Sequence, residues 1–369
     1  MVAIGWRLAM QSALYGADGF FVRPQSGPAD HFRTSVHASP LFAGALLRVA
    51  ERVDAALGHP ATFDLVDVGA GRGELLSALC ALLPAELAAR VRTVAVEKAP
   101  RPDGLNPAIR WRPDVPQTVT GLLLATEWLD NVPLDVVETD EQGRLRKVLV
   151  DRHTGAETLG GPADPAELFW ASRWWPGELG TAQGELGTAR EAAGAGREVA
   201  GAGREVAGAG RDAAGAGRSD RAPGRIEVGA SRDAAWSEAV DRVRRGAALC
   251  IDYGHRRDER PPFGTLTGFR DGRQVPPIPD GRCDVTAHVA VDSLAAAAGH
   301  PYQLVRQREA LDALGISGAR PPLSLATTDP MAYLRALSTA GAAAELTATT
   351  GLGAHWWLWH PINLDLALA

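Results

Sequence analysis

Hydrophobic positions along the 369-residue chain alternate between two spacings. Short apolar runs, typical of buried strands, fall at Phe63–Val68, Val91–Val96, Ala108–Trp111, Leu122–Ala125 and Ala247–Ile251. Between and before them, apolar residues recur three and four positions apart, as on a buried helix face, most clearly over Leu41–Val53 and Leu75–Leu83. Strands that alternate with helices predict an α/β fold with a doubly wound, Rossmann-like parallel sheet, which binds ligands at the C-terminal ends of its strands.

One long stretch breaks this pattern. From Gly177 to Arg218 the chain falls into seven-residue units such as EVAGAGR. A coiled coil needs apolar residues at two positions of each unit, but Gly and Ala stand there, and glycine costs a helix roughly 1 kcal/mol per residue. We therefore expect a duplicated, flexible insert without chemistry.

The insert divides the chain into four predicted parts. We expect residues 1–60 to be helical with one loop and to lie on the acceptor side of the site, and residues 61–175 to form the first part of the core. Residues 176–232 would be the insert, and residues 233–369 the second part of the core with the C-terminal strands. Within the last part, Trp356–Trp359 alternates like a final, buried strand.

Composition narrows the function classes. The chain is 46% hydrophobic and 22% charged, with a formal net charge of −6, whereas nucleic-acid binders usually carry a surplus of Lys and Arg. Its cysteines, Cys80, Cys250 and Cys283, lack the spacing of metal ligands. No window approaches about 18 uninterrupted apolar residues, and the N-terminus lacks a signal-peptide pattern. We expect a cytoplasmic protein without nucleic-acid, membrane or metal partners; its oligomeric state stays open.

The clearest chemical motif follows the first strand. Asp67 is followed by three alternating glycines, Gly69, Gly71 and Gly73, just before a predicted helix. Glycine suits a turn whose backbone takes positive φ and approaches a ligand without a Cβ in the way. The spacing is one residue tighter than the dinucleotide motif GxGxxG and is the form that methyltransferases use around S-adenosylmethionine. The alternative is a turn in some other α/β protein.

Two further acidic residues follow neighbouring strands. Glu97 stands at the end of the second strand, where a carboxylate can accept hydrogen bonds from both ribose hydroxyls. Asp114, after the third strand, could bind the adenine amine. Either could instead be a surface acid. Together with the glycine turn one βα unit upstream, Glu97 favours an adenosine-containing cofactor.

Five segments occur in the order known from one family. They are Phe32–Ser35 with Leu41-Phe42, the glycine turn, Thr126–Leu134, Leu249–Gly254 with Gly264–Leu266, and Gly281–Val289. The chain thus resembles the MidA-like methyltransferases, related to the mitochondrial complex I assembly factor that methylates an arginine. The resemblance implies S-adenosylmethionine as methyl donor and a protein substrate that carries the target arginine. The chain departs from the family pattern at His31, Val36-His37, Pro40, Thr126 and Trp128-Leu129, which are expected to shape the acceptor side.

The acceptor site is expected at the ends of the fourth and fifth strands. Glu127 and Asp130 could hold a guanidinium, which stays cationic in water, while Trp128 stacks on its plane or packs in the core. Asp252 and Tyr253 follow the fifth strand. Two other functions remain open: a small-molecule O- or N-methyltransferase, favoured by a His or Lys base, and a cofactor-binding assembly factor whose catalysis has decayed.

Overall fold

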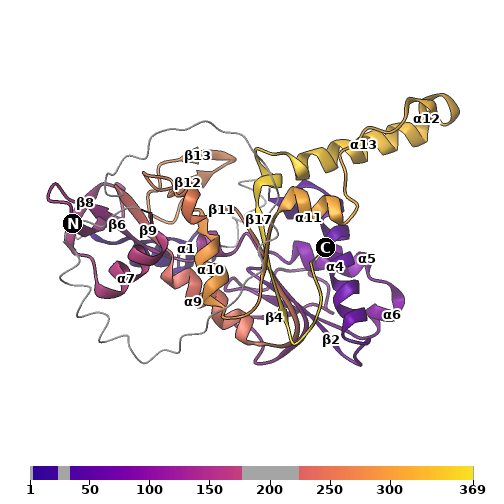
Figure 1. Cartoon of the computed structure of the whole chain (residues 1–369), viewed down its shortest axis with the longest axis horizontal. Coiled ribbons are helices and arrows are strands. Elements are labelled where there is room, and N and C mark those ends of the chain that lie inside the picture. Colours follow the sequence, from indigo (N-terminus) through magenta and orange to yellow (C-terminus); the bar gives the residue numbers. More distant parts are fainter. Residues whose placement is uncertain (1–2, 24–33, 177–223, 369) are drawn as a thin grey trace.

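The computed structural model describes residues 3–23, 34–176 and 224–368 (Figure 1). The seven-residue repeats, His31 and the Phe32-Arg33 part of the N-terminal motif lie outside the described residues. A seven-stranded sheet forms the centre of the molecule, with the strand order β16-β17-β10-β5-β2-β3-β4. These strands are β2 (Phe63–Val68), β3 (Val91–Val96), β4 (Arg110–Arg112), β5 (Val119–Thr126), β10 (Val243–Asp252), β16 (Gln303–Arg306) and β17 (Trp356–Ile362).

The five apolar runs found in the sequence are the five parallel strands of this sheet, with shifted ends for β4, β5 and β10. The expectation of an entirely parallel sheet was wrong. The final strand, β17, runs antiparallel to β10 and pairs Trp356 with Asp252. As a result, the beginning of β17 lies at the edge where β10 ends.

Neighbouring residues on the strands pack into opposite cores, because side chains alternate between the two faces of a sheet. Leu65, Leu122 and Leu249 face one core, whereas Val66 and Leu123 face the other. The first core is covered by α4 (Pro40–Ala56), α5 (Glu74–Leu82), α11 (Gln307–Ala313) and α13 (Pro330–Thr347). The second is covered by α9 (Ala230–Asp241) and α10 (Val291–Ala297). The structure is therefore a mixed α/β fold with helices on both faces of the central sheet.

A second, antiparallel sheet was not predicted. It contains β1 (Ile4–Gly5), β6 (Asp135–Thr139), β7 (Leu145–Val150), β8 (Glu157–Pro162) and β9 (Arg225–Val228). The helices α1 (Trp6–Tyr15) and α7 (Pro165–Trp174) lie on this side of the molecule, at the left of Figure 1. The strands were missed because they mix apolar and polar residues, as in LRKVLV of β7, and carry no continuous apolar run.

The second sheet changes two of the four parts into which the sequence analysis divided the chain. Part of the segment 61–175 belongs to the second sheet and not to the central one. The segment 176–232, assigned to the insert, includes β9 and the beginning of α9, so regular structure resumes by Arg225. β9 pairs with β6, although the two strands are separated in sequence by the whole repeat region.

Short elements complete the edge at which β10 ends. They are α3 (Ser35–Ala38), the 3₁₀ turn η1 (Leu129–Asn131), β11 (Gly254–His255), β12 (Thr267–Arg270), β13 (Arg273–Val275), β14 (Asp284–Thr286) and β15 (Val289–Ala290). β12 pairs with both β13 and β14, and β14 contacts η1. The segments after β5 and β10 are thereby held against each other.

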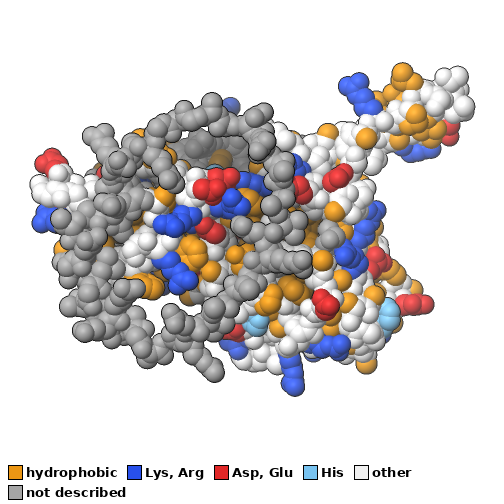
Figure 2. All heavy atoms as spheres, in the orientation of Figure 1, with side chains coloured by type: hydrophobic (Ala, Val, Ile, Leu, Met, Phe, Trp, Pro, Cys, Tyr) orange, Lys and Arg blue, Asp and Glu red, His pale blue; other side chains and the backbone are white. Residues whose placement is uncertain are grey.

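A helical arm projects from the body at the upper right of Figure 1. It consists of α12 (Leu323–Thr328) and the first turns of α13, and it carries the exposed side chains of Leu323, Met331 and Leu334 (Figure 2). Residues of α12 and α13 are absent from the linings of both cavities described below. Within the described ranges, no helix has the length and apolarity needed to cross a membrane.

Candidate functional site

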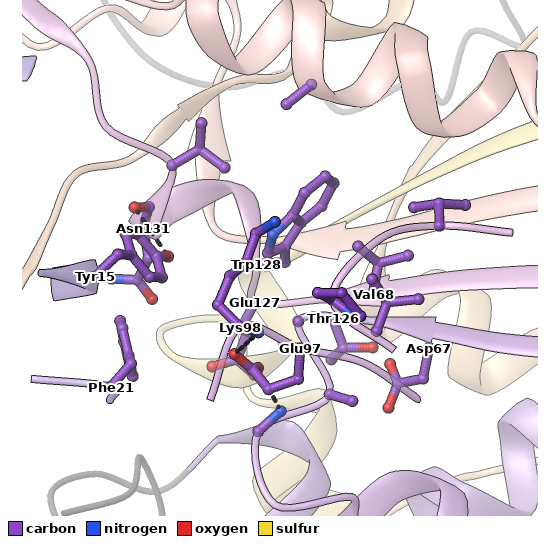
Figure 3. Close-up of a pocket in the computed structure, with 18 of the residues that line it drawn as sticks. Tyr15, Phe21, Asp67, Val68, Glu97, Lys98, Thr126, Glu127, Trp128 and Asn131 are labelled. Carbon is purple, nitrogen blue, oxygen red and sulfur yellow. Dashed lines mark hydrogen bonds between the residues drawn. The ribbon is translucent and has the colours of Figure 1, made fainter. Parts of the chain in front are cut away.

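A cavity of about 820 Å³ opens at the carboxyl ends of β2, β3 and β5 (Figure 3). Its lining includes the glycine turn after β2, Glu97 after β3 and Glu127 after β5. Tyr15 and Asn131 lie on the opposite side of the cavity from Asp67. The structure therefore brings together residues that the sequence analysis had assigned to one cofactor site.

The glycine turn requires its glycines. Gly69, Gly71 and Gly73 have φ values of 74°, 57° and 82°, a region that side-chain-bearing residues rarely adopt. A Cβ on Gly69 would lie 2.7 Å from Trp128 Cδ1, and one on Gly73 would lie 2.9 Å from Leu105 Cδ1. The turn thus presents bare backbone to the cavity and to the helix α5 that follows.

Asp67 and Glu97 place two buried carboxyl groups beside this turn. Asp67 is 3% exposed, and burial, reinforced by the carboxylates of Glu74 and Glu97, raises its pKa to about 8. Burial also raises the pKa of Glu97, whose Oε2 accepts a hydrogen bond of 3.1 Å from the backbone N–H of Gly71. A cationic ligand in this part of the cavity would favour the ionised form of both groups.

Asp114 lies at the rim. Its side chain is 81% exposed, and its Oδ1 lies 3.2 Å from Lys98 Nζ. Asp114 lines the cavity, as predicted, but water screens it and Lys98 already balances its charge. Its part in binding adenine stays a prediction.

Glu127 has a strained backbone and a buried side chain. Its φ is 50°, which is uncommon outside glycine and persists only where the surrounding structure imposes it. Oε1 accepts a hydrogen bond of 2.9 Å from the backbone N–H of Ser35 and lies 3.9 Å from His355 Nδ1. Burial raises the pKa of Glu127 to about 7. Such a carboxyl can hold a cation or accept a proton near neutral pH.

Asp130 and Asp252 occupy a different place from the one expected. Asp130 Oδ2 accepts hydrogen bonds from the hydroxyls of Tyr253 and Thr286, and Asp252 accepts from the backbone N–H groups of Leu129 and Tyr253. Both carboxyl groups are buried, and neither lines the two cavities. The geometry therefore gives them a positioning role, holding the segments after β5 and β10 together, in place of the predicted contact with the acceptor.

A second cavity, of about 500 Å³, lies on the other side of Glu127. Its lining includes Tyr253, His288, His355 and Asp284. Among the described residues, Glu127 alone lines both cavities. Of the four predicted acceptor-site residues, Glu127 and Tyr253 thus reach a cavity.

The sequence analysis missed several residues of this region. Ser35 holds Glu127, Asp284 lines the second cavity, and His355 precedes β17. Fully buried Arg232 donates to the carbonyls of Asp130, Val132, Ala287 and His288. His355 could have been found, because a polar residue next to the buried run Trp356–Trp359 lies at a sheet edge. Which of the two sheet edges His355 reaches was not predictable, however, because that depends on the antiparallel direction of β17.

The structure also places Trp128 and His37, two residues that the sequence analysis singled out. Trp128 packs against Gly69 on the side of the first cavity, so it lies with the cofactor turn and away from the second cavity. His37, one of the departures from the family pattern, lines the first cavity, where its Nδ1 lies 2.7 Å from Thr34 Oγ1.

Comparison with known proteins decides the family. Residues 47–309 match the model of a family described as "Putative S-adenosyl-L-methionine-dependent methyltransferase". The chain belongs to this family. The matched segment spans the glycine turn, Glu97, Glu127 and the second-cavity residue Asp284. The search of curated proteins gave no match.

Two solved structures share the fold of this methyltransferase family member. Both are COG1565 superfamily proteins of Burkholderia thailandensis. One, with S-adenosyl-homocysteine bound, has a TM-score of 0.68 and 22% identity. The other, a native structure, has a TM-score of 0.67 and 24% identity. Each alignment covers 99% of this chain and 89% of the other.

S-adenosylmethionine is thus the cofactor, and the first cavity fits it. The cofactor carries a sulfonium and an ammonium group, which suit the buried carboxyl of Asp67. It also carries a ribose, whose hydroxyls suit Glu97. The bare glycine backbone leaves room for the ligand. Asp67, Gly69, Gly71 and Glu97 line the cavity and are the residues that we expect to hold it; the predicted Gly73 lies outside the lining, beside Leu105.

This arrangement predicts that binding of S-adenosylmethionine strengthens as the pH rises to about 8. Asp67 is largely protonated below its pKa of about 8 and must lose that proton when a cation binds beside it. The affinity should therefore rise by at most about tenfold per pH unit between pH 6.5 and 8 and then level off. Calorimetry in buffers of different ionisation enthalpy should show proton release, and Asp67→Asn should remove most of it. Equal affinity at pH 6.5 and 8.5 would contradict the assignment.

Proposed function

We propose that this protein transfers a methyl group from S-adenosylmethionine to a cationic nitrogen, the side chain of a protein arginine. The observation that carries the proposal is Glu127, whose side chain is 10% exposed, whose backbone is strained and whose carboxyl group borders two cavities. The glycine turn and Glu97 assign the first cavity to the donor. A guanidinium that reached Glu127 would meet a hydrogen-bond acceptor of opposite charge.

Glu127 can serve this reaction in two ways. When bound, S-adenosylmethionine supplies a methyl group on a sulfonium, and the acceptor needs to be held in line with it. The Glu127 carboxylate orients the guanidinium and later accepts the proton that the methylated nitrogen loses. The hydrogen bond from Ser35 N–H fixes one carboxylate oxygen, Oε1. The pKa of about 7 permits both forms of the group to be populated.

We also infer that the central sheet has the doubly wound, Rossmann-like arrangement and that the chain is MidA-like. The strand order supports the first inference, since the order reverses between β2 and β5, beside the first cavity. Retention of Glu127, Asp130, Asp252, Tyr253 and Asp284 within the resembling motifs supports the second.

One observation favours a second candidate, an O- or N-methyltransferase acting on a small molecule. Burial, followed by the neighbouring His288, lowers the pKa of His355 to about 4, so its imidazole is neutral at pH 7. A neutral imidazole 3.9 Å from Glu127 could assist proton removal from a hydroxyl or amine.

The two candidates separate in one labelling experiment. The purified protein is incubated with S-adenosylmethionine tritiated in the methyl group and a lysate of its native cells, and the products are divided into protein and small molecules. We expect label in protein, recovered as methylarginine after acid hydrolysis. Label confined to small molecules would favour the second candidate, and donor binding without any transfer would indicate an assembly factor with decayed catalysis.

A further inference from the structure

We infer that the second cavity binds the acceptor, and that it takes a cationic head group on an extended chain. The inference rests on the proposed function and names the cavity and the kind of side chain that it would hold. Donor and acceptor would then reach Glu127 from opposite sides, each through its own cavity. The volume of about 500 Å³ is in the range of small-molecule sites.

The walls of the second cavity suit a flat cation. The Tyr253 ring lies 5.2 Å from the His288 ring and 5.6 Å from the His355 ring, centroid to centroid, and all three line the cavity. Aromatic faces attract cations, and a guanidinium also stacks on them. The outer part of the lining comes from Thr267, Phe269 and Gln274 on β12 and β13.

Four carboxyl groups lie at or next to the cavity. Glu127 and Asp284 line the cavity, and Asp130 and Asp252 are buried behind them. Arg232 is buried beside Asp130, and its guanidinium donates hydrogen bonds to four backbone carbonyls while its charge partly offsets the desolvation of Asp130 and Asp252. Burial raises the pKa of Asp284 well above its usual value, as expected where no cation is near enough to offset desolvation.

Two polar atoms of lining residues have no hydrogen-bond partner. Within the part of the chain that the structure describes, these are Nδ1 of His355 and Oδ2 of Asp284, both fully buried. Neither atom is exposed to the cavity, whereas the Glu127 side chain is 10% exposed and offers a carboxyl group that a ligand in the cavity can reach. A guanidinium carries five N–H donors and no acceptor, and an ammonium carries three.

With the donor in the first cavity and the acceptor in the second, the bonds and the proton of the methyl transfer are accounted for as follows. The acceptor nitrogen forms its bond to the methyl carbon as the bond from that carbon to sulfur breaks, and sulfur keeps the electron pair. The proton displaced from the nitrogen passes to the Glu127 carboxylate. His355 Nδ1 lies 3.9 Å from Glu127 Oε1, beyond hydrogen-bond distance, so the proton is assigned to Glu127 and not to His355.

Crystals with S-adenosyl-homocysteine, soaked in N-acetyl-L-arginine amide, test the site directly. We expect the guanidinium of this probe within hydrogen-bond distance of Glu127, with its stem in the second cavity, against the rings of Tyr253, His288 and His355. The same soak with N-acetyl-L-citrulline amide, which is neutral and nearly isosteric, should leave the cavity without the probe. Probe bound on the Tyr15 side of the first cavity, no bound probe, or equal occupancy by the two probes would overturn the inference.

A pair of variants on β13 tests the same inference in solution. Gln274 lines the second cavity, whereas its exposed neighbour Arg273 does not, because successive residues of a strand point to opposite faces. Gln274→Trp should slow methyl transfer to lysate protein by about tenfold or more and leave donor affinity unchanged. Arg273→Trp should match the wild type in both measurements.

The outcomes distinguish the inference from the proposed function. If the wild type labels no protein arginine, the proposed function fails whatever the soak shows. If it labels arginine while Gln274→Trp retains the wild-type rate, the function stands and the second cavity is not the acceptor site.

Discussion

Glu127→Gln should abolish methyl transfer while leaving the binding of S-adenosylmethionine intact. Glutamine keeps the size of the side chain and an oxygen that can accept the hydrogen bond from Ser35, but it removes the negative charge between the two cavities. Positioning an acceptor and stabilising its charge commonly supply several kcal/mol of barrier lowering, so turnover should fall by about two orders of magnitude or more. Turnover with labelled donor and calorimetric affinity are measured on the same preparation.

The pH profile gives an independent readout of the same variant. Since burial raises the pKa of Glu127 to about 7, wild-type activity should rise as the pH increases through 7 and the carboxylate forms. At saturating S-adenosylmethionine, which removes the contribution of Asp67 to donor binding, the residual activity of Glu127→Gln should lack this rise. Asp130→Asn provides an internal comparison, because Asp130 acts only through Tyr253 and Thr286; its turnover should fall less. If Glu127→Gln retains wild-type turnover, Glu127 is a structural residue and the arginine mechanism loses its main support.

The donor half of the site was predictable because its parts are local in sequence. Gly69, Gly71 and Gly73 follow an apolar strand directly, and a glycine turn between a strand and a helix has the same geometry in many α/β proteins. Glu97 stands at the end of the next strand, and adjacent parallel strands end at the same edge. No long-range information was needed beyond the order of two strands.

The proposed acceptor half depends on contacts between distant segments, which the sequence pattern does not encode. Ser35 meets Glu127 across 92 positions of the chain, and Asn131 meets Asp284 across 153. Glu127 and Asp130 are predicted to line one site because their spacing is close to one turn. The segment that carries Asp130 is a short 3₁₀ element, which directs this side chain toward Tyr253 and away from both cavities.

The antiparallel direction of β17 had the largest consequence for the site. In an entirely parallel sheet, functional residues follow strands, so the apolar runs point only to the residues that come after them. An antiparallel strand brings the residue that precedes it to that edge, which is why His355 lies beside Glu127. The second sheet was missed for a different reason: its half-exposed strands carry too few apolar residues to be distinguished from loops.

Gly71→Val should eliminate binding of S-adenosylmethionine in a protein that still folds. Gly71 has a φ of 57°, its N–H donates to Glu97, and a Cβ there would lie 3.3 Å from Glu74 Oε2. Valine is β-branched and strongly disfavours this conformation, and its methyl groups would extend into the space beside Glu74, which also lines the first cavity. We expect the affinity to fall by at least about 100-fold, or about 2.7 kcal/mol, by calorimetry.

Gly58→Val is the matched control for backbone strain. Gly58 has a φ of 77° in the loop before β2, no atom lies within 4 Å of its hypothetical Cβ, and it lies outside the lining of the donor cavity. Both variants carry valine at positive φ and should lose a similar amount of stability, about 1–3 kcal/mol, measured by denaturant unfolding. Only Gly71→Val should lose the donor. If both variants lose affinity equally, general destabilisation explains the effect; if Gly71→Val binds like the wild type, the glycine turn does not contact S-adenosylmethionine.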